Sequence, residues 1–175
     1  VRPLLFQMDP ENAHGLVKRV SKLADNPLGL GLVKAMYAHQ DPRLQVEAMG
    51  IRFPNPVGLA AGFDKDAEMV NFMAALGFGF VEIGSVTAKA RYGNQRPRLF
   101  RLPKDEALIN RMGLNNQGAD VVAERLDSLE TDAVVGVNIT KTHDPRIMGG
   151  GAIDDFGYSF AKFLDLGHYK VVNIS

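Results

Sequence analysis

The stretch Phe80-Val-Glu-Ile-Gly-Ser-Val-Thr87 has the apolar, β-branched composition of a buried strand, and similar runs recur along the chain. Those runs are Val57-Gly-Leu-Ala-Ala-Gly62, Val134-Val-Gly-Val-Asn-Ile-Thr140 and Tyr169-Lys-Val-Val-Asn-Ile174. Apolar residues at helical spacing lie between the runs, over residues 66–76, 119–129 and 153–166. Strands that are apolar on both faces and alternate with helices form parallel sheets through right-handed crossovers. The sequence therefore predicts an α/β fold with four parallel strands.

The composition excludes several kinds of protein. The chain has 175 residues, of which 46% are hydrophobic and 23% charged, as in a folded domain. Lys+Arg 20 balance Asp+Glu 20, so there is no electrostatic case for binding nucleic acid, and we expect no nucleic-acid partner. The absence of cysteine excludes disulfides, thiolate metal sites and cysteine nucleophiles, and we predict no metal site. No apolar run is long enough to cross a bilayer.

The first 44 residues differ from the rest, so we divide the chain into a helical unit, 1–44, and an α/β unit, 45–175. Asp9-Pro10 and Asn26-Pro27 each predict the start of a helix. The second helix, ending near Tyr37, is apolar nearly all round. Two interpretations stay open: an additional helical layer on the core, or a membrane-surface hairpin. The basic rim of such a hairpin would consist of Lys18, Arg19, Lys22 and Lys34.

Two segments between the regular elements are unusual. Residues 88–117 form a long excursion, and loops of this length usually carry function or a hairpin of their own. The excursion contains two apolar stretches, Arg98-Leu-Phe-Arg-Leu102 and Ala107-Leu-Ile-Asn110. Further along, Gly149-Gly150-Gly151 predicts a flexible loop before a helix that is capped by Asp154 or Asp155.

Small hydrogen-bonding residues end the strands, where parallel α/β folds place ligands. The first strand runs into Gly62 and Lys65, and the later strands end in Ser85 and Thr87, in Asn138 and Thr140, and in Asn173 and Ser175. Glycine lets a planar ring approach the main chain, and amides and hydroxyls can pair with ring N–H and C=O groups. The pattern favours a heteroaromatic ligand. At any single position, a glycine turn or a hydrogen-bonded core asparagine remains the structural alternative.

Five longer motifs resemble the dihydroorotate dehydrogenases. They are Asn55-Pro-Val-Gly-Leu-Ala-Ala-Gly-Phe-Asp-Lys-Asp66, Gly77-Phe-Gly-Phe-Val-Glu-Ile-Gly-Ser-Val-Thr87, Arg96-Pro-Arg-Leu-Phe-Arg-Leu102, Ile109-Asn-Arg-Met-Gly-Leu-Asn-Asn116 and Val172-Asn-Ile-Ser175. Together with the helical pair, they are most similar to the quinone-dependent, membrane-associated class. The resemblance implies a (β/α)8 TIM barrel, of which this chain holds about the first four β/α units.

The resemblance also implies binding sites. FMN would contact Ala61, Gly62, Phe63, Asp64, Lys65, Ser85, Asn138 and Asn173. Dihydroorotate or orotate would contact Lys65, Asn110, Arg111, Met112, Gly113, Leu114 and Asn173. His14 and Arg101 match positions at the family's quinone tunnel, although His14 is equally typical of a helix surface.

The implied activity is the oxidation of dihydroorotate to orotate by FMN, with electrons passed to quinone, in pyrimidine (UMP) biosynthesis. A base removes a proton while the flavin takes a hydride. The family's catalytic serine would be the residue immediately after Ser175, so we expect no catalytic residue within the chain and no activity of the chain alone. The implied location is peripheral at a membrane, through the helical pair, on the cytoplasmic face of the inner membrane if the source is bacterial.

One motif departs from the family pattern. Asn138-Ile-Thr-Lys-Thr-His143 carries Thr140 and Thr142 where the family commonly has Gly and Asn, which affects the expected backbone contacts to the flavin. Two other functions stay open. One is an FMN barrel oxidoreductase with a soluble acceptor, against which the helical pair argues. The other is a non-catalytic half-barrel that serves as an interaction module.

Overall fold

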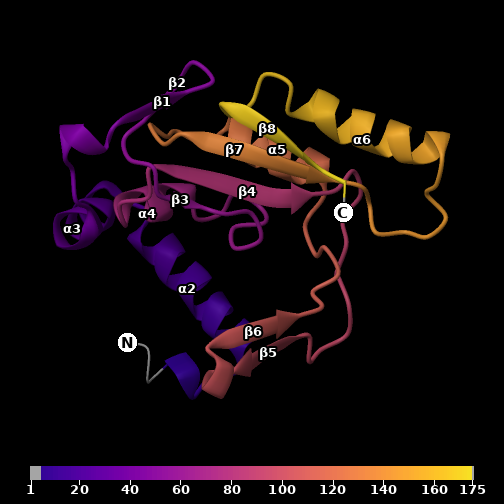
Figure 1. Ribbon diagram of the computed structural model, residues 1–175, viewed down its shortest axis with the longest axis horizontal. Coiled ribbons are helices and arrows are strands. Elements are labelled where there is room, and N and C mark those ends of the chain that lie inside the picture. The colour runs from indigo at the N-terminus through magenta and orange to yellow at the C-terminus, as the bar shows by residue number, and fades with distance from the viewer. Residues whose placement is uncertain (1–4, 175) are drawn as a thin grey trace.

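The computed structural model describes residues 5–174, and a four-stranded parallel sheet forms its centre (Figure 1). The strands are β3 (Gly58–Leu59), β4 (Phe80–Val86), β7 (Val135–Thr140) and β8 (Tyr169–Asn173), hydrogen-bonded in the order β3-β4-β7-β8. Each strand pairs with the next parallel strand of the chain, so the sheet always grows on the same side. This is the topology of a (β/α)8 barrel rather than of a doubly wound sheet. The predicted parallel α/β sheet is confirmed, while its expected last residue, Ser175, lies outside the described residues.

Helices cover the outer face of the sheet. They are α4 (Val70–Ala75), α5 (Ala119–Asp127) and α6 (Gly150–Lys162). Val81 and Ile83 of β4 and Val137 of β7 are fully buried against side chains of α4 and α5. Near β8, an apolar groove of about 440 Å³ opens between α6 and the sheet. Its walls include Ile139, Ile153, Phe156, Phe160, Leu164 and Val172.

Alternating large and small residues fill the inner face of the sheet, as in barrel interiors. A Cβ on Gly58 would lie 2.1 Å from the Phe80 ring, and one on Gly136 would lie 2.1 Å from the Tyr169 ring. The rings of Phe53, Phe80 and Tyr169 follow one another edge to face, with centroids 5.3 and 6.4 Å apart. The inner face therefore begins as an aromatic layer at the amino ends of the strands.

A short hairpin at this end was not expected from the sequence. It consists of β1 (Val46–Ala48) and β2 (Ile51–Phe53), which pair antiparallel. Its turn uses Met49 and Gly50, both at positive φ (53° and 72°). Strands of three residues are too short for a periodicity to be recognised, and Met-Gly is not one of the strong hairpin dipeptides. The hairpin supplies Phe53 to the aromatic layer.

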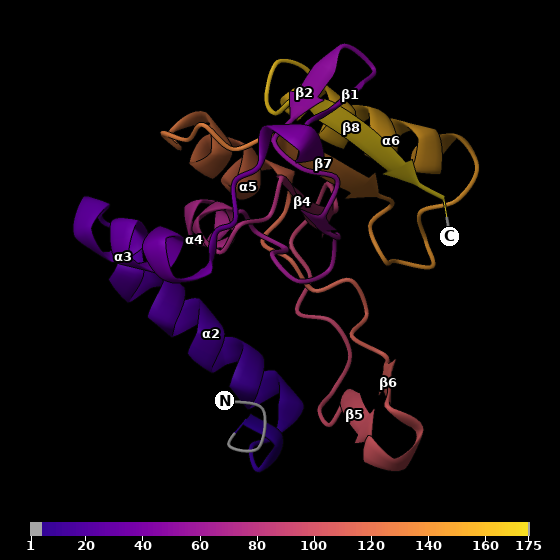
Figure 2. The same cartoon turned by 60° about the vertical axis from the view of Figure 1, so that its left-hand side comes forward.

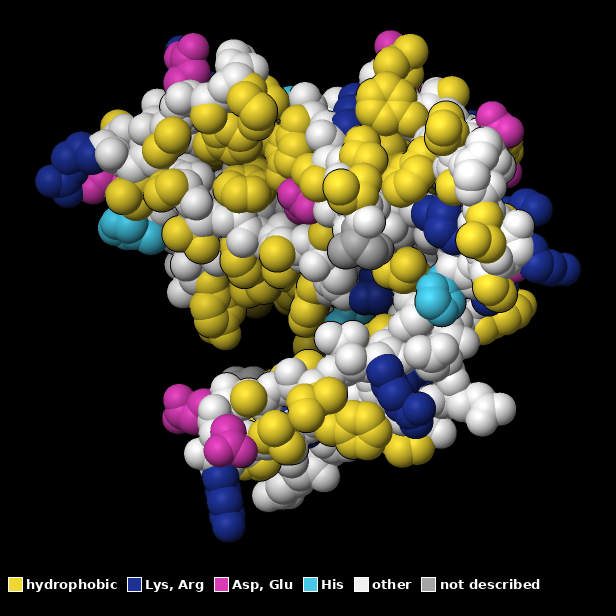
Figure 3. Space-filling view, turned by 45° about the vertical axis from the view of Figure 1, so that its right-hand side comes forward, with side chains coloured by type: hydrophobic (Ala, Val, Ile, Leu, Met, Phe, Trp, Pro, Cys, Tyr) yellow, Lys and Arg dark blue, Asp and Glu magenta, His cyan; other side chains and the backbone are white. Residues whose placement is uncertain are grey.

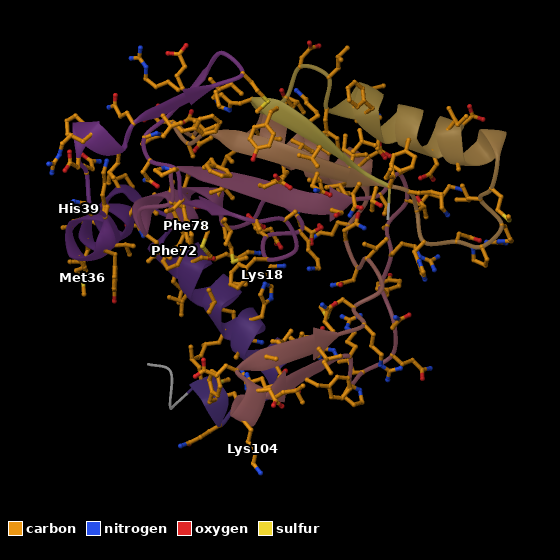
Figure 4. All side chains as sticks on the ribbon, viewed as in Figure 1. Lys18, Met36, His39, Phe72, Phe78 and Lys104 are labelled. Carbon is orange, nitrogen blue, oxygen red and sulfur yellow. The ribbon has the colours of Figure 1, made fainter. Side chains whose placement is uncertain are left out.

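Of the two expectations for the long excursion, function or a hairpin of its own, the structure shows the hairpin. It consists of β5 (Leu99–Leu102) and β6 (Ala107–Asn110), joined by the short 3-10 helix η2 (Pro103–Asp105). Figures 1 and 2 both show it projecting away from the sheet on the side where α2 begins. Lys104 extends from its tip, away from the rest of the molecule (Figure 4). The excursion therefore forms a lobe of its own, residues 88–117.

The two expected amino-terminal helices are also confirmed, as α2 (Pro10–Ala24) and α3 (Pro27–Tyr37), followed by the short 3-10 helix η1 (Pro42–Leu44). Asp9 Oδ1 accepts hydrogen bonds from Glu11 N and Asn12 N, and Asn26 Oδ1 accepts one from Gly29 N, so both predicted N-caps are formed. Helix α3 packs on α4 through one side. No helix of the described residues is both long and apolar enough to span a bilayer.

The other side of α3 is uncovered. Leu28 is 87% exposed and Met36 64% exposed. Figure 4 shows Met36 pointing away from the sheet, whereas Phe72 and Phe78 lie where α3 approaches α4. Partial packing of α3 on the core agrees with the layer interpretation, and its outer side leaves the membrane interpretation open. We call this exposed set, Leu28, Leu32, Met36 and Tyr37, the apolar side of α3.

Two predicted helix starts are wrong. Helix α6 begins at Gly150 with Gly149 as N-cap, so Asp154 and Asp155 lie inside the helix and cap nothing. Asp155 is instead buried, and its Oδ2 accepts a 2.7 Å hydrogen bond from Thr142 N. Helix α4 begins at Val70 rather than at Asp66. The preceding turn is held by the Asp64 carboxylate, which accepts hydrogen bonds from the backbone N–H groups of Glu68 and Met69.

Candidate functional site

Three polar side chains meet on the inner face near the carboxyl ends of β4, β7 and β8. Ser85 Oγ donates a 2.5 Å hydrogen bond to Asn138 Oδ1, and Asn173 Nδ2 donates a 3.5 Å hydrogen bond to Ser85 Oγ. Asn138 is 7% exposed. We call Ser85, Asn138 and Asn173 the strand-end cluster. Parallel strands bring their ends to the same edge of a sheet, which is why residues up to 88 positions apart meet here.

Glu82 and Tyr169 support this cluster from the layer beneath it. Asn138 Nδ2 donates to Glu82 Oε1 at 2.9 Å, and Tyr169 OH donates to Glu82 Oε2 at 3.2 Å. The Glu82 carboxylate can only accept a hydrogen bond, so it faces the Asn138 NH₂ group, and the Ser85 hydroxyl donates to the Asn138 oxygen. These two contacts fix the orientation of the Asn138 amide. Burial and the neighbouring Glu82 carboxylate raise the pKa of Tyr169, so its hydroxyl stays a donor. We did not predict either residue, although Glu82 is the one charged residue in the run 80–87.

The Ala61–Lys65 segment lies beside the end of β4. Gly62 N donates to Gly84 O at 2.7 Å, and Gly84 N donates to Asp64 O at 3.0 Å. Gly62 has φ +106°, and a Cβ built on it would point into open space, so the main chain is accessible there. Lys65 Nζ donates to Gly62 O. Burial lowers the pKa of Lys65, and the positive charge of Arg98 acts in the same direction.

Asp64 has a mainly structural role among the predicted cofactor residues. It is 1% exposed, and each of its carboxylate oxygens accepts a backbone hydrogen bond. Burial raises the pKa of Asp64, and the two backbone N–H groups oppose that effect. The Asp64 side chain therefore shapes the turn and is not available to a ligand, whereas the main chain at Gly62 is accessible.

Four polar residues on one side of α2 fasten that helix to the loops at the carboxyl ends of the strands. Their spacing of three and four residues places them on one helix face. His14 Nε2 donates to Phe63 O at 2.8 Å, and its ring meets the Phe63 ring edge to face. Lys18 and Lys22 form ion pairs with Glu68, and Glu11 pairs with Arg98. We call Glu11, His14, Lys18 and Lys22 the polar stripe of α2.

The predicted substrate loop, residues 110–114, follows β6. Asn110 is exposed, and its Oδ1 accepts a 3.4 Å hydrogen bond from Met112 N. Arg111 is exposed and donates from Nη2 to Pro97 O at 3.0 Å. Gly113 and Leu114 have φ values of +76° and +53°, which turn the chain sharply. The loop approaches the sheet through Asn116, whose amide exchanges hydrogen bonds with Thr87 N and Oγ1 at the end of β4.

Arg101, on β5, contacts residues just before α2. Its Nη1 donates to Met8 O at 2.6 Å, and its guanidinium lies 4.7 Å from the centre of the Phe6 ring. A cleft of about 290 Å³ opens nearby between α2 and the excursion, and Glu11, Arg96 and Arg98 line part of it. The space-filling view shows the body notched between the excursion lobe and the rest (Figure 3). His14, on α2, thus contacts Phe63, whereas Arg101, on β5, contacts Phe6 and Met8 just before α2.

The two threonines that depart from the family pattern hold loops together. Thr140 Oγ1 donates to Asn173 O at 3.0 Å, which ties β7 to β8. Thr142 Oγ1 accepts a 3.2 Å hydrogen bond from Lys89 N, which ties the loop after β7 to the loop after β4. Lys141 Nζ donates to Thr142 O and Asp144 O at 3.1 and 3.3 Å. Both hydroxyls therefore have partners within the protein.

The residues at this edge fit a flat, polar heteroaromatic ring such as the flavin of FMN. The accessible main chain at Gly62, the ammonium of Lys65 and the strand-end cluster offer donors and acceptors of the kind that ring N–H and C=O groups require. Ammonium and amide donors also suit a carboxylate-bearing pyrimidine. The arrangement can hydrogen-bond such a ring and thereby orient it.

Comparison with known proteins gives consistent matches. The model of the family described as "Dihydroorotate dehydrogenase" matches residues 43–175. The chain is 50% identical over 176 residues to a dihydroorotate dehydrogenase (quinone) of Natronomonas pharaonis, covering 100% of this chain and 49% of that protein. It is 48% identical over 174 residues to the protein of the same name from Gloeobacter violaceus, covering 99% and 49%.

Solved structures agree with these relatives. The chain superposes on the crystal structure of ligand-free type DHODH from Eimeria tenella with a TM-score of 0.78 and 42% identity, covering 94% of this chain and 45% of that one. The Eimeria tenella DHODH in complex with ferulenol gives a TM-score of 0.78 and 39% identity, covering 97% and 46%. The chain spans about half the length of the curated relatives it matches.

Proposed function

Because the chain belongs to the dihydroorotate dehydrogenase family, we propose that it forms the amino-terminal part of an enzyme that oxidises dihydroorotate to orotate and passes the electrons to a quinone. We call this enzyme, with the barrel continued to the length of the relatives, the full-length enzyme. The reaction belongs to pyrimidine biosynthesis. Residues 1–44 would be its helical unit and residues 45–175 the first half of its barrel.

The cofactor in this proposal is FMN. Backbone groups of Ala61, Gly62, Phe63 and Asp64 would border the flavin, and Lys65 with the strand-end cluster would hydrogen-bond its polar edge. When bound, FMN supplies the hydride acceptor for the reaction. Asn138 is suited to this role because Glu82 and Ser85 already fix its amide. Preorganised polar groups of this kind need no rearrangement when a ligand arrives.

The substrate would lie between the strand ends and the excursion. The loop residues Asn110, Arg111, Met112, Gly113 and Leu114 would enclose the orotate ring, and Lys65 and Asn173 would contact it from the sheet. The ammonium of Lys65 would pair with the anionic substrate, which offsets the effect of burial on its pKa. The catalytic base in this proposal is the residue immediately after Ser175, so these residues bind and orient rather than remove the proton.

Quinone would enter beside α2, where His14 contacts Phe63 and Arg101 contacts Phe6 and Met8. The apolar side of α3, together with the exposed basic residues Lys34 of α3 and Arg19 of α2, would rest on a membrane surface. This corresponds to a peripheral membrane protein, at the cytoplasmic face of the inner membrane if the source is bacterial.

The proposal is carried by one observation: the Ala61–Lys65 segment, the strand-end cluster and the excursion all contact the carboxyl end of β4. The test is to purify the full-length enzyme, identify the released flavin, and follow dihydroorotate-dependent reduction of a long-chain quinone and of a soluble dye. We expect bound FMN and activity with both acceptors. Activity with a soluble acceptor alone would favour the soluble-acceptor oxidoreductase, and absence of both flavin and activity would favour a non-catalytic module.

A further inference from the structure

Arg98 lies buried where α2, the start of the excursion and the predicted substrate loop meet. It is 7% exposed and its Nε and Nη2 donate to the Glu11 carboxylate, at 3.2 Å and 2.6 Å. Its Nη1 donates to Tyr92 O at 2.6 Å and Asn94 O at 3.0 Å, with Met112 O at 3.5 Å. One guanidinium thus joins a helix to two separate stretches of loop.

The turn at residues 92–94 is interlocked with the substrate loop. Asn94 N donates to Met112 O at 3.0 Å, and Asn94 Nδ2 donates to Arg111 O at 2.7 Å. A Cβ on Gly93 would lie 2.2 Å from Met112 O, and one on Gly113 would lie 2.8 Å from Asn94 N. Both glycines also have positive φ values. The two stretches are therefore fastened to each other, and Arg98 hydrogen-bonds to both.

Arg98 and Glu11 each need the other's charge in this buried position. A buried guanidinium without a counter-charge is costly, and the hydrogen bonds from Arg98 hold the pKa of Glu11 below its usual range, so the carboxylate stays ionised. A lysine could keep the charge at this position. It could not keep the forked geometry that reaches the Glu11 carboxylate on one side and the carbonyls of residues 92, 94 and 112 on the other.

We propose that Glu11 and Arg98 are a positioning pair that holds the substrate loop, residues 110–114, in its binding conformation and links it to α2. Neither residue needs to touch the substrate. The same helix contacts Phe63 through His14, so α2 reaches both the proposed flavin segment and, through the pair, the proposed substrate loop. The proposal rests on the proposed function for what the loop binds.

The chain offers a matched control. Arg96 also pairs with Glu11 Oε1, at 2.9 Å, but its side chain is 64% exposed, whereas that of Arg98 is 7% exposed. Arg96→Gln removes a positive charge that pairs with the Glu11 carboxylate. It leaves the contacts between Arg98 and the backbone carbonyls in place. If Arg98→Lys or Glu11→Gln acted only through surface charge, its effects would match those of Arg96→Gln.

The experiment compares Arg98→Lys, Glu11→Gln and Arg96→Gln in the full-length enzyme. We expect Arg98→Lys and Glu11→Gln to raise the KM for dihydroorotate at least tenfold with a soluble dye acceptor, while the flavin content stays the same. Amide hydrogen exchange in peptides covering 92–96 and 110–114 should speed up at least tenfold, with peptides of α6 unchanged. Arg96→Gln should change either quantity by less than twofold.

Unchanged KM and unchanged loop exchange in both variants would overturn the proposal. Exchange that speeds up equally in α6 and in the loop would also overturn it, since the pair would then serve only global stability. If the unaltered enzyme does not oxidise dihydroorotate, the proposed function fails, whereas the exchange data still decide whether the pair holds the loop. The two failures are therefore distinguishable.

Discussion

Lys65 is the residue on which ligand binding should depend most. It is partly buried beside Gly62, and in the proposed function its ammonium faces the anionic substrate and the flavin edge. Lys65→Ala in the full-length enzyme should cost about 2–4 kcal/mol of transition-state stabilisation, the range found when a charged or oxyanion-type contact is deleted. The measurement is kcat/KM per bound flavin. Lys104→Ala, at the exposed hairpin tip, is the control and should leave this quantity unchanged.

Glu68 gives a prediction about pH. Burial alone would raise the pKa of Glu68, but hydrogen bonds and charge from Lys18 and Lys22 outweigh it and leave the pKa lowered. A carboxylate with a lowered folded-state pKa stabilises the fold above its unfolded pKa, and this contribution is lost as the pH falls through the folded-state value. Glu68→Gln should therefore destabilise by about 1–2 kcal/mol at neutral pH.

The difference in the free energy of unfolding between the parent and Glu68→Gln should shrink as the pH falls below the ordinary pKa range of glutamate. Denaturant unfolding of the full-length enzyme and its variant at several pH values measures it. A difference that stays constant down to strongly acidic pH would show that packing, rather than the Glu68 charge, is responsible.

At the level of elements, the helical pair contains two separable parts. The polar stripe of α2 fastens the pair to the barrel loops, whereas the apolar side of α3 is uncovered. The proposed membrane attachment could therefore be weakened without touching the contacts of α2. The triple variant Leu28→Gln, Leu32→Gln and Met36→Gln should lower binding to anionic vesicles at least tenfold, because burying each such side chain contributes about 1.5–3 kcal/mol.

Vesicle sedimentation and turnover with a long-chain quinone should fall together in this triple variant, and turnover with a soluble dye should persist. Met49→Gln, at the exposed β1–β2 turn, replaces an apolar side chain outside α3 and should change none of these. If the triple variant still sediments with vesicles like the parent, the apolar side of α3 does not rest on the membrane.

A helix or strand could be predicted where its own residues carry a clear sequence pattern. The strands over 80–86 and 135–140 were recognised because burial on both faces requires continuous apolar runs. The start of α6 was misplaced because its cap, Gly149, has no side chain, while Asp154 and Asp155 have the side chains that caps usually use. The β1–β2 hairpin was missed because its strands are three residues long.

At the level of the whole molecule, the 175-residue chain by itself should be inactive. In the proposed function the base lies just after Ser175, and further FMN contacts would come from the later strands. Purified 1–175 should therefore bind FMN weakly and show no dye-linked oxidation of dihydroorotate above a flavin-free blank. The full-length enzyme in the same assay is the control. Turnover by 1–175 would place a sufficient set of catalytic groups within it.

The candidate site could be predicted only where topology brings chain segments together by rule. Strand ends of a parallel sheet always share an edge, so Ser85, Asn138 and Asn173 could be grouped from their positions alone. The contacts of α2 follow no such rule. Glu11 meets Arg98 across 87 positions, and His14 meets Phe63 across 49, because the helix happens to cross the loops there. Such docking is decided by tertiary packing and leaves no periodic signal in the sequence.

The groove between α6 and β8 bears on how the isolated chain would behave in solution. β8 is the last strand of the sheet and pairs with β7 along one edge, so its other edge directs backbone N–H and C=O groups outward, next to Val172, which is 52% exposed. An open strand edge beside apolar side chains is a template for pairing with another chain. Preparations of 1–175 should therefore self-associate and precipitate as their concentration rises, and a soluble sample would need dilution or a co-expressed partner that covers this edge.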